Sequence, residues 1–554
     1  MYLLAKSYGF SCHHKHNLRL SIRLPILLII CLLCMSTKAE YGGGTGQPED
    51  PYLIYTAEQM NEIGINPSDW DKHFKLMDDI DLSAYSGRDF NIIGKSRSSA
   101  FSGVFDGNNK KISNFSYSSA NKDYAGLFSY VWGAGAEIRN LGLIDPNIDA
   151  GTGSLVGLLI GYLHEGTITN CYTRNGSVSG KNKVSGLIGY THAGTITKCR
   201  VEGVSISGND EVGGLVGHNR AEIEDCYSNC SVSGNSVVGG LIGENRGAEI
   251  TNSYARGVVS ASGDNVGGLV GENSNSGKIS YCYYKGDIFG GRLTGGLVGQ
   301  NSGSITNSCS GGIVSGEDGV GGLVGQSFSV IINNCYTTCV VSGDKTVGGL
   351  VGSSGGSIIS NCYATGTVSG VENIGGLIGL NTAGSNIAYC YSAGAVTGTT
   401  DVGGLVGLNY EGVISASFWD NQTSGQRRMC GWQGTWATGC NDRNGKTTDE
   451  MQTENTFLNA GWDFVDESAN GTRDIWSICE RLDYPKLTWQ FLIGDFDNDY
   501  RVDFLDFAVF AEHWLSSDID FFWCRGADLT SDGIVDFSDL KEFLRNWLTD
   551  DISN

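Results

Sequence analysis

The central part of the chain alternates short hydrophobic runs with stretches of glycine, serine and asparagine, and this alternation has a fixed interval. A leucine in a Gly-Gly-Leu-Val-Gly-like motif returns every 26 to 28 residues, at Leu159, Leu187, Leu215, Leu241, Leu269, Leu297, Leu323, Leu350, Leu377 and Leu405. An isoleucine returns at the same interval, at Ile168, Ile196, Ile223, Ile250, Ile279, Ile305, Ile332, Ile359, Ile387 and Ile414. A period of this size is typical of proteins built from stacked repeats.

Each repeat contains three short runs of β-forming residues and lacks the spacing of an amphipathic helix. One repeat cannot bury its hydrophobic side chains alone, whereas stacking in register places leucine on leucine and isoleucine on isoleucine. The pattern therefore predicts an all-β fold, a parallel β-solenoid of about ten rungs of about 27 residues over residues 151–420. At about 4.8 Å per rung this rod would be roughly 50 Å long.

The segments on either side keep only part of the repeat pattern. Residues 40–150 are predicted to hold an N-terminal cap and degenerate first rungs, because Phe101–Tyr117 echoes the repeat and Thr56–Met60 is typical of a helix start. Residues 421–490 are rich in tryptophan and are predicted to cap the other end. Caps are expected because the open end of a solenoid exposes unpaired strand edges.

The repeated motif also resembles a known family. The sequence Gly-Gly-Leu-Val-Gly-x-Asn, at Gly213–Asn219 and again at Gly267–Asn273, is similar to the GLUG repeat of bacterial surface proteins. The resemblance covers roughly residues 100–420. It implies exposure at a cell surface and a binding role, and it implies no single enzymatic activity.

Composition narrows the range of partners. The 554 residues include 82 glycines and only 6 prolines, which suits many tight turns in an ordered fold. The formal net charge of −23 repels phosphate backbones, so a nucleic-acid partner is not expected. The same charge favours interaction with divalent cations.

The first 39 residues have the layout of a signal peptide. Basic residues from Lys6 to Arg23 precede an apolar run, Leu24–Met35, and small residues surround a plausible cleavage point near Ala39. The run is short for a membrane span, although an uncleaved N-terminal anchor is the alternative. We expect a secreted, extracellular or cell-surface protein with no transmembrane segment after signal removal.

Three polar columns share the interval of the repeats and are candidates for chemistry. Asparagines near the motif are interpreted as a structural ladder of hydrogen-bonded amides: Asn219, Asn245, Asn273, Asn301, Asn381 and Asn409. Cysteines three residues after the isoleucine are expected to be free, buried thiols: Cys171, Cys199, Cys226, Cys282, Cys335, Cys362 and Cys390. Acids before the motif form either a cation-binding strip or a solvated turn edge: Asp210, Glu211, Asp264, Asp318, Asp344, Glu372 and Asp401.

The remaining cysteines and histidines give weaker signals. Cys430 and Cys440 can close a short disulfide loop in an oxidising compartment. His164 opens a segment resembling a zinc-protease motif, but Ile168 stands where the second histidine belongs, so the motif fails. His164 and His192 occupy one column of neighbouring rungs and are interpreted as packing partners.

The last 60 residues change to two acidic loops, each followed by an amphipathic stretch. Oxygen ligands have the spacing of EF-hand loops at Asp495, Asp497, Asp499, Arg501 (through its carbonyl), Asp503 and Asp506, and again at Asp528, Thr530, Asp532, Ile534 (through its carbonyl), Asp536 and Asp539. So many carboxylates repel one another without a cation, and calcium removes this repulsion. We therefore predict two calcium ions in a small two-loop α-helical domain, residues 491–550.

This segment resembles a dockerin over Gly494–Leu548. Dockerins bind cohesin domains and attach secreted proteins to larger assemblies or to cell surfaces, so the resemblance implies a cohesin-like partner. The match is imperfect, because Tyr500 stands where the first loop should have the turn glycine that Gly533 supplies in the second. The second loop is therefore expected to bind calcium more tightly.

Three functions remain open from the sequence, the third of which is a pure spacer that lifts another module off the cell. The first is a secreted, non-catalytic β-solenoid for binding, adhesion or scaffolding, docked by its C-terminal module, with extracellular polysaccharide or a host or cell-surface ligand as the possible target. The alternative is an extracellular polysaccharide lyase or glycoside hydrolase that carries a dockerin. No catalytic residues are predicted, because the repeats are uniform, and a cluster of non-repeating charges on the middle of the rod would favour the enzyme.

Overall fold

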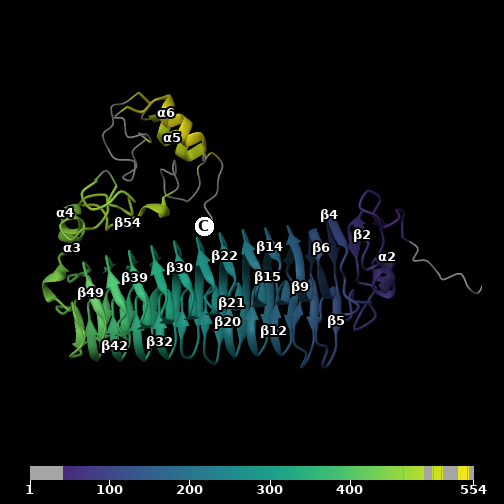
Figure 1. The fold of residues 1–554 in the computed structure, drawn as a ribbon, viewed down its shortest axis with the longest axis horizontal. Coiled ribbons are helices and arrows are strands. Elements are labelled where there is room, and N and C mark those ends of the chain that lie inside the picture. The colour runs from purple at the N-terminus through teal and green to yellow at the C-terminus, as the bar shows by residue number, and fades with distance from the viewer. Residues whose placement is uncertain are drawn as a thin grey trace, which may run out of the picture. The chain divides into compact units, whose positions relative to one another are not determined.

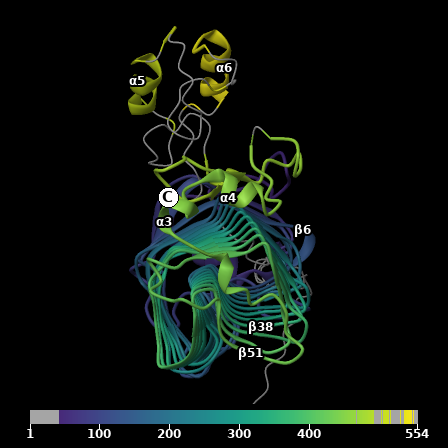
Figure 2. The same cartoon turned by 90° about the vertical axis from the view of Figure 1, so that its left-hand side faces the viewer.

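The computed structural model describes residues 41–465, 467–491, 502, 504–512, 514–515, 529, 534–545 and 547. The predicted signal peptide lies outside these residues. The chain from Tyr52 to Lys446 forms a parallel β-solenoid of about 14 turns, seen from the side in Figure 1 and along its axis in Figure 2. The predicted fold class is confirmed for this part of the chain.

One turn of the solenoid contains four strands rather than the three that the sequence predicted. In residues 210–234 they are β16 (Asp210–Gly213), β17 (Val216–Asn219), β18 (Glu222–Glu224) and β19 (Tyr227–Gly234). The fourth strand arises because the short segment before the motif's leucine pairs in a separate ten-stranded sheet, from β8 to β47. The other strands of the solenoid turns belong to one continuous 42-stranded sheet.

Equivalent strands of successive turns form four ladders. The first is β8 (Val156–Gly157), β12 (Asn182–Ser185), β16, β20 (Ser236–Gly239), β24 (Val266–Gly267), β28 (Thr294–Gly295), β32 (Asp318–Gly321), β37 (Lys345–Gly348), β42 (Glu372–Gly375) and β47 (Thr400–Gly403). The second is β9 (Ile160–Thr169), β13 (Ile188–Thr191), β17, β21 (Ile242–Arg246), β25 (Val270–Ser274), β29 (Val298–Asn301), β33 (Val324–Phe328), β38 (Val351–Gly355), β43 (Ile378–Thr382), β48 (Val406–Asn409) and β51 (Cys430–Gln433). The third, which β9 enters with its last residues, is β14 (Thr195–Thr197), β18, β22 (Glu249–Thr251), β26 (Lys278–Ser280), β30 (Ser304–Thr306), β34 (Ile331–Asn333), β39 (Ile358–Ser360), β44 (Asn386–Ala388) and β49 (Val413–Ser415).

The fourth ladder divides into two short strands in several turns. It consists of β10 (Tyr172–Arg174), β11 (Ser177–Ser179), β15 (Arg200–Ser207), β19, β23 (Tyr254–Ala261), β27 (Tyr283–Phe289), β31 (Cys309–Ser315), β35 (Tyr336–Thr337), β36 (Val340–Ser342), β40 (Tyr363–Ala364), β41 (Val368–Ser369), β45 (Tyr391–Ser392), β46 (Val396–Thr397), β50 (Phe418–Asp420) and β52 (Gly445–Lys446). The irregular strands before the repeats are β1 (Tyr52–Ile54), β2 (His73–Leu76), β3 (Ile80–Asp81), β4 (Val104–Ser113), β5 (Ser116–Ser118), β6 (Phe128–Ile144) and β7 (Asn147–Asp149).

The two hydrophobic columns face the interior, as the sequence predicted. Ile250 pairs with Ile279, and Ile279 pairs with Ile305, so the isoleucine column runs in register through the third ladder. Both the isoleucine and the leucine columns are buried from end to end. The stacking that defines the fold therefore rests on these two repeated side chains.

The structure has more turns than the ten regular rungs predicted, because the first strands, where the sequence predicted degenerate rungs, continue the same ladders. Phe74 in β2 pairs with Phe105 in β4, and Phe105 pairs with Ile138 in β6, which pairs with Ile168. These residues extend the isoleucine column, but phenylalanine replaces isoleucine and the spacing is irregular. The loss of identity and period explains why the sequence shows these turns only faintly.

Asparagine at one corner explains part of the composition. Asn252, Asn307, Asn334 and Asn361 follow the third ladder and have φ between 46° and 54°. This left-handed conformation is unfavourable for most residues and is tolerated best by glycine and asparagine. The corner turns the chain toward the fourth ladder.

A compact segment after β52 covers one side of the last turns. It contains helices α3 (Thr448–Met451) and α4 (Glu454–Leu458) and the antiparallel pair β53 (Trp476–Ser477) and β54 (Lys486–Leu487). In this segment Trp462 and Trp476 are buried against tyrosines of the fourth ladder. Trp489 Nε1 also donates to the carbonyl oxygen of Asn334 at 2.9 Å. This segment contacts several turns along the rod as well as its end.

Three further helices lie outside the solenoid turns. Helix α2 (Ala57–Ile65) begins after Thr56, whose hydroxyl accepts from the Gln59 backbone N–H at 3.3 Å. Helices α5 (Phe504–Glu512) and α6 (Phe537–Arg545) share an apolar cluster that includes Phe510 and Phe543.

Candidate functional site

The predicted calcium ligands lie mostly outside the described residues. Asp495, Asp497, Asp499, Arg501, Asp503, Asp528, Thr530 and Asp532 fall outside them, and Asp506, Ile534, Asp536 and Asp539 fall inside. Asp506 in α5 and Asp539 in α6 are buried. Asp539 accepts from the Asp536 backbone N–H at 2.8 Å, and Asp536 accepts from the Ser538 backbone N–H at 2.7 Å, so these acids also cap the start of α6.

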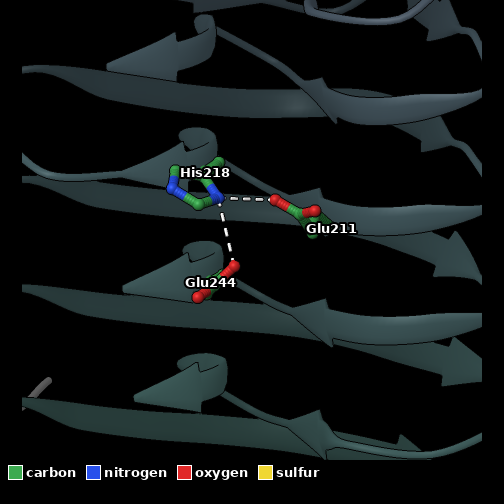
Figure 3. A group of neighbouring side chains, drawn as sticks. All are labelled: Glu211, His218 and Glu244. Atoms are coloured by element: carbon green, nitrogen blue, oxygen red, sulfur yellow. Dashed lines mark hydrogen bonds and ion pairs between the residues drawn. The ribbon is translucent and has the colours of Figure 1, made fainter. Parts of the chain in front are cut away.

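A cluster of three ionisable side chains lies on the middle of the rod. Glu211 from β16 and His218 from β17 belong to one turn, and Glu244 from β21 belongs to the next (Figure 3). His218 Nδ1 lies 2.6 Å from Glu211 Oε2 and 3.1 Å from Glu244 Oε2. One nitrogen therefore faces two carboxylates from consecutive turns.

Burial makes this cluster different from a surface ion pair. The His218 side chain is 5% exposed, and those of Glu211 and Glu244 are 20% and 16% exposed. Burial lowers the pKa of His218, but hydrogen bonds and attraction from the two glutamates outweigh it and place the pKa above its ordinary value. Burial raises the pKa of Glu244, yet His218 outweighs that effect and brings the pKa to about 2.

Other polar side chains hold the two carboxylates from outside. Lys183 pairs with Oε1 of Glu211, and Ser274 donates to Oε1 of Glu244 at 2.9 Å. On the following turn Glu272 continues the column of Glu244. Burial and then the charge of Glu244 raise the pKa of Glu272.

For the acids before the motif the sequence left two interpretations open, a cation-binding strip and a solvated turn edge. Asp318 pairs with Arg292 at 3.8 Å, and Glu372 pairs with Lys345 at 3.4 Å, both at exposed edges of the rod. These residues fit the solvated turn edge rather than a continuous cation strip. Sequence reasoning did not connect Glu211 with His218, although His218 occupies the variable position of the motif and aligns with Glu244 one repeat later.

The asparagine and cysteine columns behave as predicted. Asn245 donates to Asn273 Oδ1 at 2.9 Å, and Asn273 donates to Asn301 Oδ1 at 2.8 Å. The seven cysteines of the column are free and buried, as are three others in the turns. Cys430 and Cys440 form a disulfide.

Histidines near the cluster have a packing role. His164 and His192 stack with ring centroids 4.6 Å apart and planes 7° apart, as the sequence predicted. His218 stacks in the same way on Tyr190 at 4.6 Å. The stack fixes the plane of the His218 ring and so the direction of Nδ1.

Among the described helices, none combines the length and hydropathy that crossing a membrane requires.

Comparison with known proteins identifies the repeat. The model of the GLUG motif matches residues 234–260, 343–369 and 370–397. Halomucin of Haloquadratum walsbyi is 36% identical over 148 residues, which cover 26% of this chain and 2% of halomucin. A protein of Evansella cellulosilytica named as a Gly-rich membrane protein is 32% identical over 155 residues, covering 26% of this chain and 18% of that protein. The chain thus spans less than one fifth of either relative.

One solved structure also matches, a protein of Bacteroides ovatus described as an immunoglobulin A1 protease. Its sequence is 17% identical, and the TM-score is 0.29. The superposed part covers 81% of this chain and 96% of that protein's chain. So low a score carries no argument about function. The motif matches and the stacked turns together show a β-solenoid that carries GLUG repeats.

Proposed function

We propose that the protein is a secreted, surface-associated β-solenoid that binds or presents a surface without catalysis. The observation that carries this proposal is the continuity of the columns, because leucine and isoleucine keep their positions through the ten regular turns and asparagine keeps its position in six of them. Such continuity supports an extended scaffold. The GLUG matches and the similarity to halomucin and to a protein named as a membrane protein support the surface location.

We further propose that a dockerin-like module attaches the rod to a cohesin-type partner when calcium is bound. The two acidic loops with EF-hand spacing support this, as do the short helices that follow them and share an apolar cluster. Calcium offsets repulsion among the loop carboxylates and thereby stabilises the partner-binding form. Extracellular polysaccharide or a cell-surface ligand is the proposed target of the rod.

The attachment is tested by capture of partners from culture supernatant with the mature protein as bait. We expect a partner to be retained in millimolar calcium and released by a chelator. The double variant Asp528→Ala, Asp495→Ala should lose the partner, whereas Asp474→Ala, an exposed acid outside the loops, should retain it. Calcium-independent retention would contradict the docking proposal.

A second candidate function is polysaccharide cleavage, and one pair of residues favours it. Glu244 and Glu272 occupy paired positions on adjacent turns, and their pKa values move in opposite directions, with that of Glu244 lowered to about 2 and that of Glu272 raised. Such separation is typical of a base and an acid that share one reaction. The cluster is also the non-repeating charge group that the enzyme alternative requires.

The position of this pair favours the non-catalytic proposal. Two grooves near the last turns, of about 550 and 370 Å³, are lined by residues such as Tyr389 and Arg473 and contain neither glutamate. Release of reducing or unsaturated ends from acidic and neutral polysaccharides is the deciding assay. We expect no release by pure protein, and release that disappears in Glu272→Gln but not in Glu249→Gln would establish the enzyme.

A further inference from the structure

We propose that Glu211, His218 and Glu244 form a binding site for one divalent transition-metal ion that joins two consecutive turns of the rod. The three side chains offer ligand atoms within 4.8 Å of one another. Imidazole nitrogen combined with carboxylate oxygen is a donor set that suits zinc and related metals. This inference does not depend on the proposed function, because it concerns only the solenoid.

The carboxylate oxygens of Glu211 and Glu244 are oriented toward His218 by partners outside the cluster. Lys183 holds Oε1 of Glu211, and the hydroxyl of Ser274 holds Oε1 of Glu244. In each glutamate the remaining oxygen, Oε2, faces His218 Nδ1. Partners outside the cluster therefore fix both carboxylates and leave one oxygen of each turned inward, which is how outer groups orient the ligands of metal sites.

His218 Nδ1 has too few hydrogens for the two carboxylate oxygens that face it. Nδ1 carries at most one hydrogen, yet two carboxylate oxygens lie 2.6 and 3.1 Å from it. One hydrogen cannot make two strong, well-aligned bonds, so one oxygen is poorly satisfied whichever bond forms. A cation in place of that hydrogen satisfies the nitrogen and both oxygens together, with no competition among them.

The spacing of the three ligand atoms is close to that of a metal site, and solvent reaches the two glutamates. Zinc binds nitrogen and oxygen at about 2.0 to 2.2 Å, so ligand atoms around one ion lie roughly 3 to 3.5 Å apart. The distance of 3.1 Å from Nδ1 to Glu244 lies within this range, and the distance of 2.6 Å to Glu211 is shorter, so a modest outward movement of Glu211 is enough for coordination. Both glutamates are partly exposed, so an ion can enter from solvent and keep water as a further ligand.

Within the part of the chain that the structure describes, the cluster occurs at one place on a repetitive surface. The position of His218 is filled by Tyr190 one turn earlier and by Glu244 one turn later. On the next turn Asn265 and Glu272 occupy the positions of Glu211 and His218, and Glu272 accepts from Asn265 at 3.1 Å, so that pair lacks both the histidine and the second carboxylate. Structural ladders in this rod repeat a residue from turn to turn, whereas this group combines two glutamates with a histidine, and among the described residues it is the one group of three metal-ligating side chains so close together.

The test uses the mature protein in saturating calcium, so that any calcium sites are occupied, and adds zinc chloride or cobalt chloride after removal of trace metals. Bound zinc is counted by mass spectrometry after equilibrium dialysis. We expect the parent to hold one more zinc ion per chain than His218→Ala or Glu244→Gln. The cobalt-loaded parent should show a visible absorption band that both variants lose, and zinc should raise Tm only in the parent.

His192→Ala is the matched control, because it removes a histidine of a neighbouring column and leaves the cluster intact. This variant should keep the zinc count and the cobalt band of the parent. An equal zinc count in the parent, His218→Ala and Glu244→Gln would overturn the proposal, as would loss of the ion in His192→Ala alone. Circular dichroism verifies folding, and if His218→Ala does not fold, Glu211→Gln decides by the same count.

Discussion

The side-chain amide of Asn245 donates to the side-chain oxygen Oδ1 of Asn273 on the next turn, at 2.9 Å, with both residues fully buried. Each amide also donates to a backbone carbonyl of its own turn, that of Ala248 for Asn245 and that of Gly277 for Asn273. One residue type thus satisfies polar groups both within a turn and between turns. Buried amides of this kind are costly to remove, because every partner loses a bond.

Asn273→Ala should lower the stability of the rod by about 2 to 4 kcal/mol, because partners on three sides lose a buried hydrogen bond. Thermal melting followed by circular dichroism measures the effect. Asn235→Ala, at an exposed corner, should melt within a degree or two of the parent. A melt of Asn273→Ala that matches this control would show that the amide ladder does not stabilise the fold.

Ile279→Asp should cost several kcal/mol, because it buries an unpaired charge in the isoleucine column. Ile279→Val keeps the column apolar and should cost only about 1 kcal/mol. Chemical denaturation of both variants beside the parent checks the difference. If Ile279→Asp unfolds together with Ile279→Val, the column does not form the core.

Glu202 makes the stability of the rod depend on pH. Burial raises its pKa, but the hydrogen bond from Tyr227 and the pairing with Arg174 outweigh burial, so the pKa lies below its ordinary value. A lowered pKa contributes stability that is present above the unfolded value, about 4.3, and is lost as pH falls through the folded value. Glu202 is partly exposed, so the contribution is about 1 kcal/mol or less.

Glu202→Gln should therefore melt below the parent at pH 7, and the difference should shrink as pH falls from about 4.3 toward 3. Melting curves of both proteins from pH 3 to 8 measure it. Glu249→Gln, which removes an exposed acid, should show little difference at either pH. A gap between Glu202→Gln and the parent that persists at pH 3 would mean that the charge of Glu202 is not the cause.

The buried thiols should be inert in the folded protein. Burial raises the pKa of Cys282 to about 12, which leaves almost no thiolate at neutral pH. We expect no reaction of the ten solenoid cysteines with iodoacetamide under native conditions and complete reaction in denaturant. Mass spectrometry after each treatment counts the labels, and rapid native labelling of Cys282 would contradict its burial.

The sequence predicted the parts of the fold that repeat. The leucine and isoleucine columns are recognisable because the same residue returns in ten repeats, and the asparagine ladder is recognisable because asparagine returns in six of them. The first turns were less clear, because Phe74 and Phe105 fill the column with a different side chain at an irregular interval. Repeated residues made the regular turns recognisable in the sequence, whereas the first turns of the solenoid lie before the regular repeats.

The mid-rod cluster needed structure for a different reason. His218 and Glu244 align when the motifs are superposed, so these two of the three residues could be found from the sequence. Glu211 joins them only because the chain turns at this residue, where φ is 55°, and directs its side chain toward His218. A corner conformation of this kind is not readable from the spacing of residues.

The parallel register of the turns has a consequence for how such a chain can change in evolution. Each strand bonds to the equivalent strand of the turn before and the turn after, as Ile279 does with Ile250 and Ile305. No contact within the regular repeats counts how many turns there are. Duplication or loss of one whole repeat would rejoin matching surfaces and alter the reach of the rod by about 4.8 Å. Length is therefore adjustable by recombination between repeats without the invention of any new contact.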